Sequence, residues 1–344
     1  MDFKVNSSDL LKAISHIHGV VEIRHTLPIL SNMIITAKDG CLKLCSTNLD
    51  IYCSDQVNAE VLLPGEISVS ASTFHEIIKR LPNGSDLHAT LDEESSSLIL
   101  KCGRSKFNLT TMKTDDFPTI ADTDLDINFV LSATELIRMI DKTKFAISNE
   151  ETRYYLNGIF FHKTQKDSIE VLRTVATDGH RLAQYDIPLP QGAEEMTGLI
   201  IPKKTILELR RVLDDANGDI NISLNDNKIK FSFNDLSIIS KVIDGTFPDY
   251  TKVIPKNNNK VFATNSNELK SAIDRVSAVS ISEEIKSKAI KLLIESNKLL
   301  LSVESLSKGS ANEEVDINYN EEKVEIGFNS RYLVDICNEI DGEE

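Results

Sequence analysis

The sequence has no apolar run that approaches the ~18 to 20 residues a helix needs to cross a bilayer. Its first residues, Met1-Asp2-Phe3-Lys4-Val5, also lack the apolar segment of a secretory signal. Cysteine is scarce and odd in number, at five, and no set of cysteines and histidines has the spacing of a zinc site. We therefore expect a cytoplasmic protein with reduced cysteines, no metal, no cofactor and no membrane association.

Positive charge is also in short supply. Acidic residues outnumber basic ones by 53 to 38, which gives a net charge of −15. This balance argues against indiscriminate binding to nucleic acid, so any surface for a polyanion must be local and concave or enclosed. With 344 residues and 41% apolar content, the chain can bury two or three substantial cores.

One short pattern recurs six times along the chain: an acidic residue, an apolar residue directly after it, and a second apolar residue four positions further on. The copies are Asp9-Leu10 with Ile14, Glu76-Ile77 with Leu81, Glu135-Leu136 with Ile140, Glu208-Leu209 with Leu213, Glu268-Leu269 with Ile273, and Asp335-Ile336 with Ile340. Their first apolar residues lie 67, 59, 73, 60 and 67 residues apart, so the copies pair and the pair repeats about every 130 residues. The spacing predicts three similar domains, each with two short helices whose apolar pattern residues face a core.

The segments around these helices predict an α+β fold. Each odd-numbered helix follows a phenylalanine and a polar cap, with an acid three residues after the cap: Phe3, Asn6 and Asp9; Phe129, Ser132 and Glu135; Phe262, Asn265 and Glu268. Antiparallel strands are expected from alternating segments such as 42–45, 98–102, 228–233 and 299–303. We place the domains at 1–124, 125–257 and 258–344.

The third predicted domain differs from the second at its end. About 40 residues separate Leu213 from the linker that follows the second repeat, whereas the sequence stops at Glu344, soon after the last helix. We expect the third domain to lack its last strands.

The outward face of the six helices is basic. The residue two positions after the first apolar one lies about 200° around a helix from it and should face water. These residues are Lys12, Lys79, Arg138, Arg211, Ser271 and Asn338, and the odd helices add His16, Lys142 and Arg275 four residues later. Their recurrence predicts a face for a polyanion; the alternative is that lysine and arginine are simply good exposed helix formers.

Several longer motifs resemble one known family. They are Thr26-Leu27-Pro28-Ile29-Leu30, Arg153-Tyr154-Tyr155-Leu156-Asn157-Gly158, residues 174–183 (TVATDGHRLA), residues 244–250 (DGTFPDY) and Glu325-Ile326-Gly327-Phe328-Asn329. In this order they resemble the bacterial sliding clamps, the beta subunits of DNA polymerase III, over the whole chain.

The resemblance implies a head-to-tail homodimer of three-domain protomers that closes into a ring around duplex DNA, with helices lining the inner face and antiparallel sheets outside. It implies a processivity factor that slides without sequence specificity, itself non-catalytic although part of a nucleotidyltransferase (transferase) holoenzyme in DNA replication. The implied partners are double-stranded DNA, the DNA polymerase III alpha subunit, the clamp loader, and other clamp-binding polymerases and repair proteins.

The predicted DNA contacts combine the basic faces with the resemblance. The set is Lys12, Arg24, Lys79, Arg80, Arg138, Tyr154, Tyr155, Lys203, Lys204 and Arg211. Phosphate contacts suit a sliding protein because they attract without encoding sequence. The two tyrosines could stack on exposed bases, or could instead pack under the domain linker. At Thr73 the family often has a basic residue, so the contact set is not fully preserved.

The resemblance also implies two protein-binding surfaces. An apolar cleft between the second and third domains would accept peptide tails of partners. Its predicted residues are Arg153, Leu156, Thr177, Gly179, His180, Arg181, Leu182, Pro248, Lys252 and Val253. The family completes this cleft with a C-terminal strand ending in Met-Pro-Met or similar, which this sequence does not contain. At the dimer interface, Phe107 and Leu109 would face Ala278 and Val279 of the neighbour.

Two other function classes remain to be weighed. Asp178-Gly179-His180 places an acid and an imidazole around a glycine and could act in general acid/base catalysis, although no nucleophile motif or phosphate loop accompanies it. The alternative for this segment is a tight turn in which Asp178 caps backbone amides. A sequence-specific DNA regulator would need its base-reading side chains grouped on one helix, whereas the cations here are spread over several.

Overall fold

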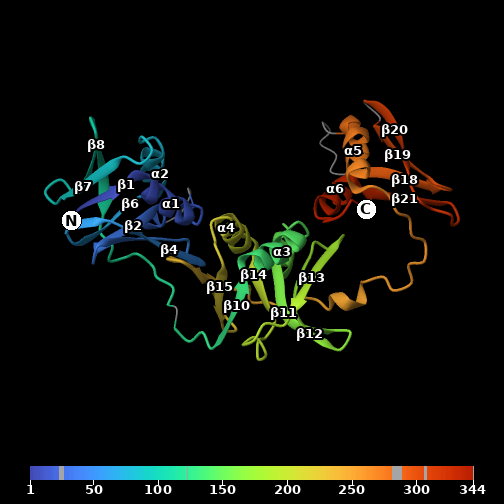
Figure 1. Cartoon of the computed structure of the whole chain (residues 1–344), viewed down its shortest axis with the longest axis horizontal. Helices are drawn as coiled ribbons and strands as arrows, with labels where there is room; N and C mark the ends of the chain where they lie inside the picture. The colour runs from blue at the N-terminus through green and yellow to red at the C-terminus, as the bar shows by residue number, and fades with distance from the viewer. Residues whose placement is uncertain (23–26, 122, 281–288, 306–307, 344) are drawn as a thin grey trace. The chain divides into compact units, whose positions relative to one another are not determined.

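The computed structural model describes residues 1–22, 27–121, 123–280, 289–305 and 308–343. These residues form two compact units, Met1–Phe247 and Pro248–Glu344 (Figure 1). The first predicted domain and most of the second therefore fall in unit 1, whereas residues 248–257, the end of the second predicted domain, fall in unit 2 together with the third. The three domain boundaries remain predictions.

Unit 1 contains helices and two antiparallel sheets. Its helices are α1 (Ser7–His18), α2 (Ala71–Lys79), α3 (Ala133–Lys144) and α4 (Lys203–Leu213). The larger sheet has the order β10-β15-β16-β17-β4-β3-β2-β6-β9-β8-β7-β1-β5. Its strands are β1 (Asp2–Asn6), β2 (Asn32–Lys38), β3 (Cys41–Thr47), β4 (Ile51–Asn58), β5 (Glu60–Leu63), β6 (Gly65–Ser70), β7 (Asp86–Asp92), β8 (Ser97–Cys102), β9 (Ser105–Met112), β10 (Ile127–Ser132), β15 (Asp219–Leu224), β16 (Lys228–Phe233) and β17 (Leu236–Lys241). The smaller sheet, β13-β12-β11-β14, contains β11 (Gly158–Lys166), β12 (Ile169–Thr177), β13 (Leu182–Pro188) and β14 (Leu199–Pro202).

The helices begin where the sequence predicts them. Asn6 and Ser132 cap α1 and α3 with their side-chain oxygens, and Ser132 forms a reciprocal capping box with Glu135. Helix α1 packs beside α2, and α3 packs beside α4. The expected α+β class, with two short helices on antiparallel sheet in each repeat, is confirmed.

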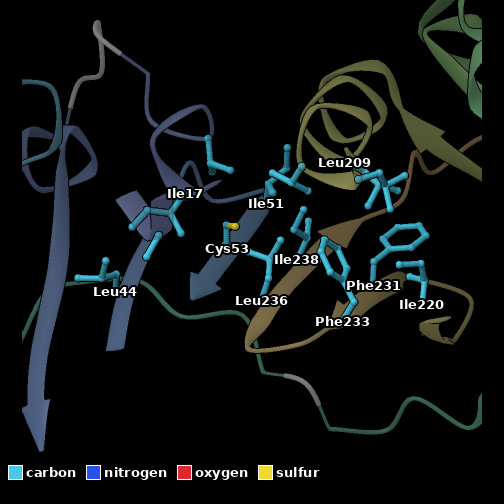
Figure 2. Packing of buried hydrophobic residues seen from close by; sticks show 14 of the residues in the cluster. Ile17, Leu44, Ile51, Cys53, Leu209, Ile220, Phe231, Phe233, Leu236 and Ile238 are labelled. Atoms are coloured by element: carbon cyan, nitrogen blue, oxygen red, sulfur yellow. The ribbon is translucent and has the colours of Figure 1, made fainter. Parts of the chain in front are cut away.

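A strand pairing joins the two halves of unit 1. Strand β17 from the second half pairs antiparallel with β4 from the first, with Ile238 opposite Cys53. Both side chains are buried, and they lie side by side in a core that runs from Ile17 to Leu209 (Figure 2). Because the ladder and the core both cross the joint, the two halves share one hydrophobic interior.

Unit 2 has a separate cluster of buried residues around Ile273, Leu301 and Tyr319. Helices α5 (Ser266–Ser277) and α6 (Ser330–Asn338) pack together beside the sheet β20-β19-β18-β21. Its strands are β18 (Ala289–Glu295), β19 (Lys298–Ser305), β20 (Gly309–Asp316) and β21 (Val324–Asn329). Asn265 caps α5 through the amides of Asn267 and Glu268.

The expectation that every repeated apolar residue faces a core is wrong for the last helix. Ile336 is 47% exposed and Ile340 is 41% exposed. On the neighbouring strand β21, Ile326 and Phe328 are exposed as well. On α2, Ile77 is only partly buried. The helical period was predicted correctly, but a period does not reveal whether anything covers the apolar side.

The two clusters predict two separable unfolding transitions. Ile238→Ala removes buried side-chain volume from the joint of unit 1, and Leu301→Ala does the same in unit 2. Each should destabilise its own unit by about 2–5 kcal/mol, because lost burial and a residual cavity add. Urea unfolding followed by circular dichroism should show one transition moved in each variant, so the two variants act as controls for each other. A shift of both transitions by Ile238→Ala would contradict separate cores.

Candidate functional site

Basic side chains lie on the outward faces of α1, α2 and α3. The side chain of Lys12 is 58% exposed, and Lys79 and Arg138 are also exposed. Lys12 lies 3.8 Å from Asp215, a contact too long and too open to neutralise it. These three predicted DNA residues therefore present charge to solvent from three different helices.

Two other residues predicted to contact DNA connect the two halves of unit 1. The guanidinium of Arg211 on α4 donates to the backbone oxygens of Ser15 (2.6 Å) and His16 (2.9 Å) at the end of α1. The ammonium of Lys204 donates to Val20 O (3.2 Å) and to Glu22 Oε1 (2.7 Å). Both side chains remain partly exposed, but each is paired with a carboxylate, Lys204 with Glu22 and Arg211 with Glu208 at 2.8 Å, so their main contribution is to connect α4 to α1.

The expectation that His16 extends the exposed basic face is wrong. His16 is 8% exposed and lies between Asp55 on β4 and Asp215 just after α4. The covering residues come from a neighbouring strand and from the second half of the unit. No signal near position 16 in the sequence points to either partner.

A histidine pair between α1 and α2 was not predicted from the sequence. The rings of His18 and His75 stack with centroids 4.5 Å apart. Burial lowers the pKa of both rings, and the mutual repulsion of the two lowers that of His18 further. Both shifts favour the neutral form of the rings. His75 lies one helical turn before Lys79, so it shares the stripe that the sequence marks as basic.

The remaining basic residues predicted to contact DNA are Arg80, Lys203 and Arg24. Arg80 pairs with Glu76 one turn earlier on α2. Lys203, at the start of α4, donates to Asn149 Oδ1 at 2.6 Å. Arg24 lies outside the described residues.

Tyr154 and Tyr155 lie in the short helix η2 (Glu151–Leu156), edge to face with centroids 5.8 Å apart. Tyr154 is 53% exposed. Both side chains approach Gly245, where an added Cβ would lie 3.1 Å from Tyr155 Cβ and 3.4 Å from Tyr154 Cε2 in the ring. The pair thus packs against the segment that leads to Phe247 while Tyr154 keeps a face open to solvent.

The Asp178-Gly179-His180 segment is a tight turn. One carboxylate oxygen of Asp178 accepts from the amides of His180 (2.9 Å) and Arg181 (3.0 Å), and the other accepts from Arg181 Nε (3.1 Å). These bonds occupy the acid, which confirms the structural interpretation of this segment. Gly179 has φ +85°, and a Cβ there would lie 2.5 Å from Arg153 Nη1. Glycine is therefore needed both for the backbone conformation and for the approach of Arg153.

The other predicted cleft residues divide between the units. On unit 1, Leu156 is buried, and Thr177 donates to Arg181 O at 2.6 Å, next to Leu182 at the start of β13. On unit 2, Pro248, Lys252 and Val253 are all exposed, with Val253 at 69%. Asp249 caps the short helix η3 (Tyr250–Lys252) that carries Lys252.

The predicted dimer residues also occur on both units. Phe107 and Leu109 alternate on β9 and are partly buried. Phe107 borders an open pocket of about 580 Å³ with Ile77, Leu81 and Pro82. On unit 2, Ala278 is exposed and Val279 partly so, in the short helix η4 (Ala278–Ser280) that follows α5.

Two general features of the described residues bear on function. No helix among them is long and apolar enough to cross a membrane. Within the same ranges, no group of three or more histidine, cysteine, aspartate or glutamate side chains is placed to hold a metal ion.

Comparison with known proteins covers nearly the whole chain. Models of the N-terminal, central and C-terminal domains of the DNA polymerase III beta subunit match residues 1–121, 130–249 and 251–344. The beta sliding clamp of Caulobacter vibrioides is 41% identical over 344 residues, which are 100% of this chain and 92% of the relative. That of Escherichia coli K12 is 34% identical over 343 residues, 98% and 90% of the two chains.

Solved structures agree with this assignment. The sliding clamp of Bartonella birtlesii bound to griselimycin superposes with a TM-score of 0.95 at 41% identity, covering 100% of this chain and 91% of that one. The clamp of Pseudomonas aeruginosa bound to griselimycin gives 0.90 at 35% identity, with the same coverage. The chain therefore belongs to the bacterial sliding-clamp family, the beta subunits of DNA polymerase III.

Proposed function

We propose that the chain is a processivity factor: two copies join head to tail into a ring that encircles duplex DNA and slides along it. The observation that carries this proposal is the exposed cation at the same place on three helices, Lys12, Lys79 and Arg138, in a chain of net charge −15. Phosphates attract such cations irrespective of base sequence, so the contacts permit sliding. Lys203, Lys204, Arg80, Arg24 and Arg211 complete the set of basic residues proposed to contact DNA.

The tyrosine pair extends the proposed DNA contacts. The exposed ring of Tyr154, supported by Tyr155 and the segment around Gly245, suits stacking on an unpaired base near a primer end. Tyr155 acts mainly as its support.

The proposed partners are the DNA polymerase III alpha subunit, the clamp loader, and other clamp-binding polymerases and repair proteins. Short peptide tails of these proteins would bind against the Gly179 turn and Leu182, where Arg153 approaches Gly179 and the guanidinium of Arg181 lies over the Phe145 ring. Pro248, Lys252 and Val253, the other residues predicted for peptide binding, belong to unit 2. The role is tethering rather than chemistry, and the comparisons give no support for transferase or nucleotidyltransferase activity in the chain itself.

The proposed ring needs an interface between copies. We assign it to β9 and the adjoining pocket, with Phe107 and Leu109 receiving Ala278 and Val279 of a second copy. An apolar pocket beside an alternating strand offers both side-chain packing and backbone pairing.

The DNA contacts are tested by the double charge reversal Lys79→Glu with Arg138→Glu. Removing two phosphate contacts should weaken binding to a duplex at low salt and reduce the slope of log K against log salt by about 2. Fluorescence anisotropy with two unrelated duplex sequences measures both effects, and the two sequences should bind alike.

The matched control for the Lys79→Glu, Arg138→Glu variant is Lys38→Glu with Lys43→Glu, which makes the same charge change on strands β2 and β3. The control should bind DNA nearly as the parent does. Equal loss in both double variants would mean that net charge, rather than the helix face, governs binding.

The peptide surface is tested by Leu182→Ala. Truncating an apolar anchor should weaken binding of a peptide from the tail of the polymerase alpha subunit by about fivefold to tenfold, measured by calorimetry. Ile169→Ala, an exposed residue at the far end of the neighbouring strand β12, should leave the affinity unchanged. Unaltered affinity in Leu182→Ala would remove this residue from the proposed cleft.

The interface is tested by Phe107→Asp with Leu109→Asp. Two carboxylates desolvated in an apolar contact should shift the protein toward monomer by a hundredfold or more in dissociation constant, on the order of 3 kcal/mol. Light scattering over a concentration series gives this constant. Leu62→Asp with Leu63→Asp, on the exposed strand β5, is the control. If both pairs leave the parent's mass unchanged, β9 is not the interface.

A further inference from the structure

His16 occupies a buried position across the joint of unit 1. Its Nδ1 lies 2.6 Å from Asp55 Oδ2, and its Nε2 lies 2.9 Å from Asp215 Oδ2. Asp55 belongs to β4 in the first half of the unit, whereas Asp215 follows α4 in the second half. One imidazole ring therefore spans the two halves.

The two contacts determine how many protons the ring must carry. Ionised carboxylates only accept hydrogen bonds, and a neutral imidazole has one N–H to donate. Both contacts are hydrogen bonds at the same time only when the ring is an imidazolium. In a neutral ring, one nitrogen lone pair would face a carboxylate oxygen.

Protonation of either carboxyl group, instead of the His16 ring, is less favourable. Lys12 lies 3.8 Å from Asp215, whose side chain is half exposed; the hydrogen bond from His16, and then Lys12, lower the pKa of that carboxyl. The second oxygen of Asp55 accepts the amide of Gln56 at 2.7 Å, as a carboxylate does. The positive charge therefore belongs on His16.

The charged and titratable groups around the ring come from each packed element. Asp9 and Lys12 come from α1, and Cys53 and Asp55 from β4; Arg211 and Asp215 come from α4 and the residues after it. Asp235, in the turn between β16 and β17, lines the same pocket of about 410 Å³. These groups include four carboxylates and two cations, Lys12 and Arg211. The net negative charge around the ring favours an imidazolium.

We propose that His16 is a positioning residue that works as an imidazolium: it ties α1 to the end of α4, and this tie is lost when the ring gives up its proton. The tie fixes the helix that carries Lys12 relative to the one that carries Arg211. The joint itself does not depend on DNA binding, so it can be tested on the protein alone.

The pH dependence follows from opposing effects on the ring. Burial alone would lower the pKa of His16, but the hydrogen bonds to Asp55 and Asp215 outweigh it, so the pKa lies above its usual value near 6.5. A raised pKa in the folded state stabilises the fold fully below about 6.5, and this stabilisation is lost as the pH rises through the folded-state pKa. The pKa of Asp215 is lowered, so its part is present above about 3.8 and is lost only in acid.

The first experiment is nitrogen NMR of the full chain with ring-labelled histidine between pH 6 and 9. The signal missing in His16→Gln identifies the residue. We expect both ring nitrogens of His16 to report an imidazolium at pH 7 and to titrate above 6.5. A neutral single tautomer at pH 7 would overturn the proposal, and this readout needs only the parent to be well folded.

The second experiment compares urea unfolding of unit 1 in the parent, His16→Gln and Asp215→Asn over the same pH range. At pH 6 the unfolding constant should rise about tenfold in His16→Gln, since a buried acceptor loses its donor. This difference should shrink toward pH 9. Asp215→Asn should lower the pKa of His16 in the NMR titration, because it removes a carboxylate partner. His88→Gln, whose partner Asp2 lies in the same half of the unit, should leave the titration of His16 unchanged. A difference between parent and His16→Gln that is constant with pH would show a packing role only.

Discussion

The pairing of β4 with β17 is the constraint on which the rest of unit 1 depends. A strand at the edge of a sheet exposes unsatisfied backbone groups, and here each half of the unit supplies the strand that covers the other's edge. The ladder brings Cys53 against Ile238, so the two cores merge into one. With the halves held in this register, α4 reaches the end of α1, and side chains far apart in sequence become partners.

The end of α1 shows how this approach satisfies the backbone. The last carbonyls of a helix have no partner within it. Those of Ser15 and His16 accept from Arg211, and that of Ile17 accepts from Ser46 Oγ at 2.6 Å. Glu208 fixes the guanidinium of Arg211 at 2.8 Å and approaches Gly19 so closely that a Cβ there would lie 2.0 Å from Glu208 Oε2. The absence of a side chain at Gly19 therefore permits the helix-to-helix cap.

Features that depend on residues close in sequence could be predicted. Features that depend on whether a distant segment covers a side chain could not. The caps at Asn6, Ser132 and Asn265 and the turn at Asp178 depend on residues within a few positions, so the sequence identifies them. A helical wheel places His16 outward because it contains only its own helix, whereas Asp215 lies 199 residues away. The same wheel places Ile336 inward, although the side chain is 47% exposed. For the candidate DNA surface, the sequence identified the cations but not that Lys204 and Arg211 also build the joint.

Basic residues that face solvent and basic residues that connect the two halves of unit 1 differ in their response to salt. Charges in water lose most of their interaction beyond a Debye length of about 8 Å at physiological ionic strength, and partly buried pairs lose less. Lys12, Lys79 and Arg138 face solvent and would attract phosphates across it, so their effect weakens as salt rises. Arg211 instead donates to backbone carbonyls that have no counterion to exchange. If this surface binds DNA as proposed, salt can vary that binding while the contacts between the two halves of unit 1 stay closed. This separation lets an acidic protein carry a basic face without making its own architecture depend on the polyanion.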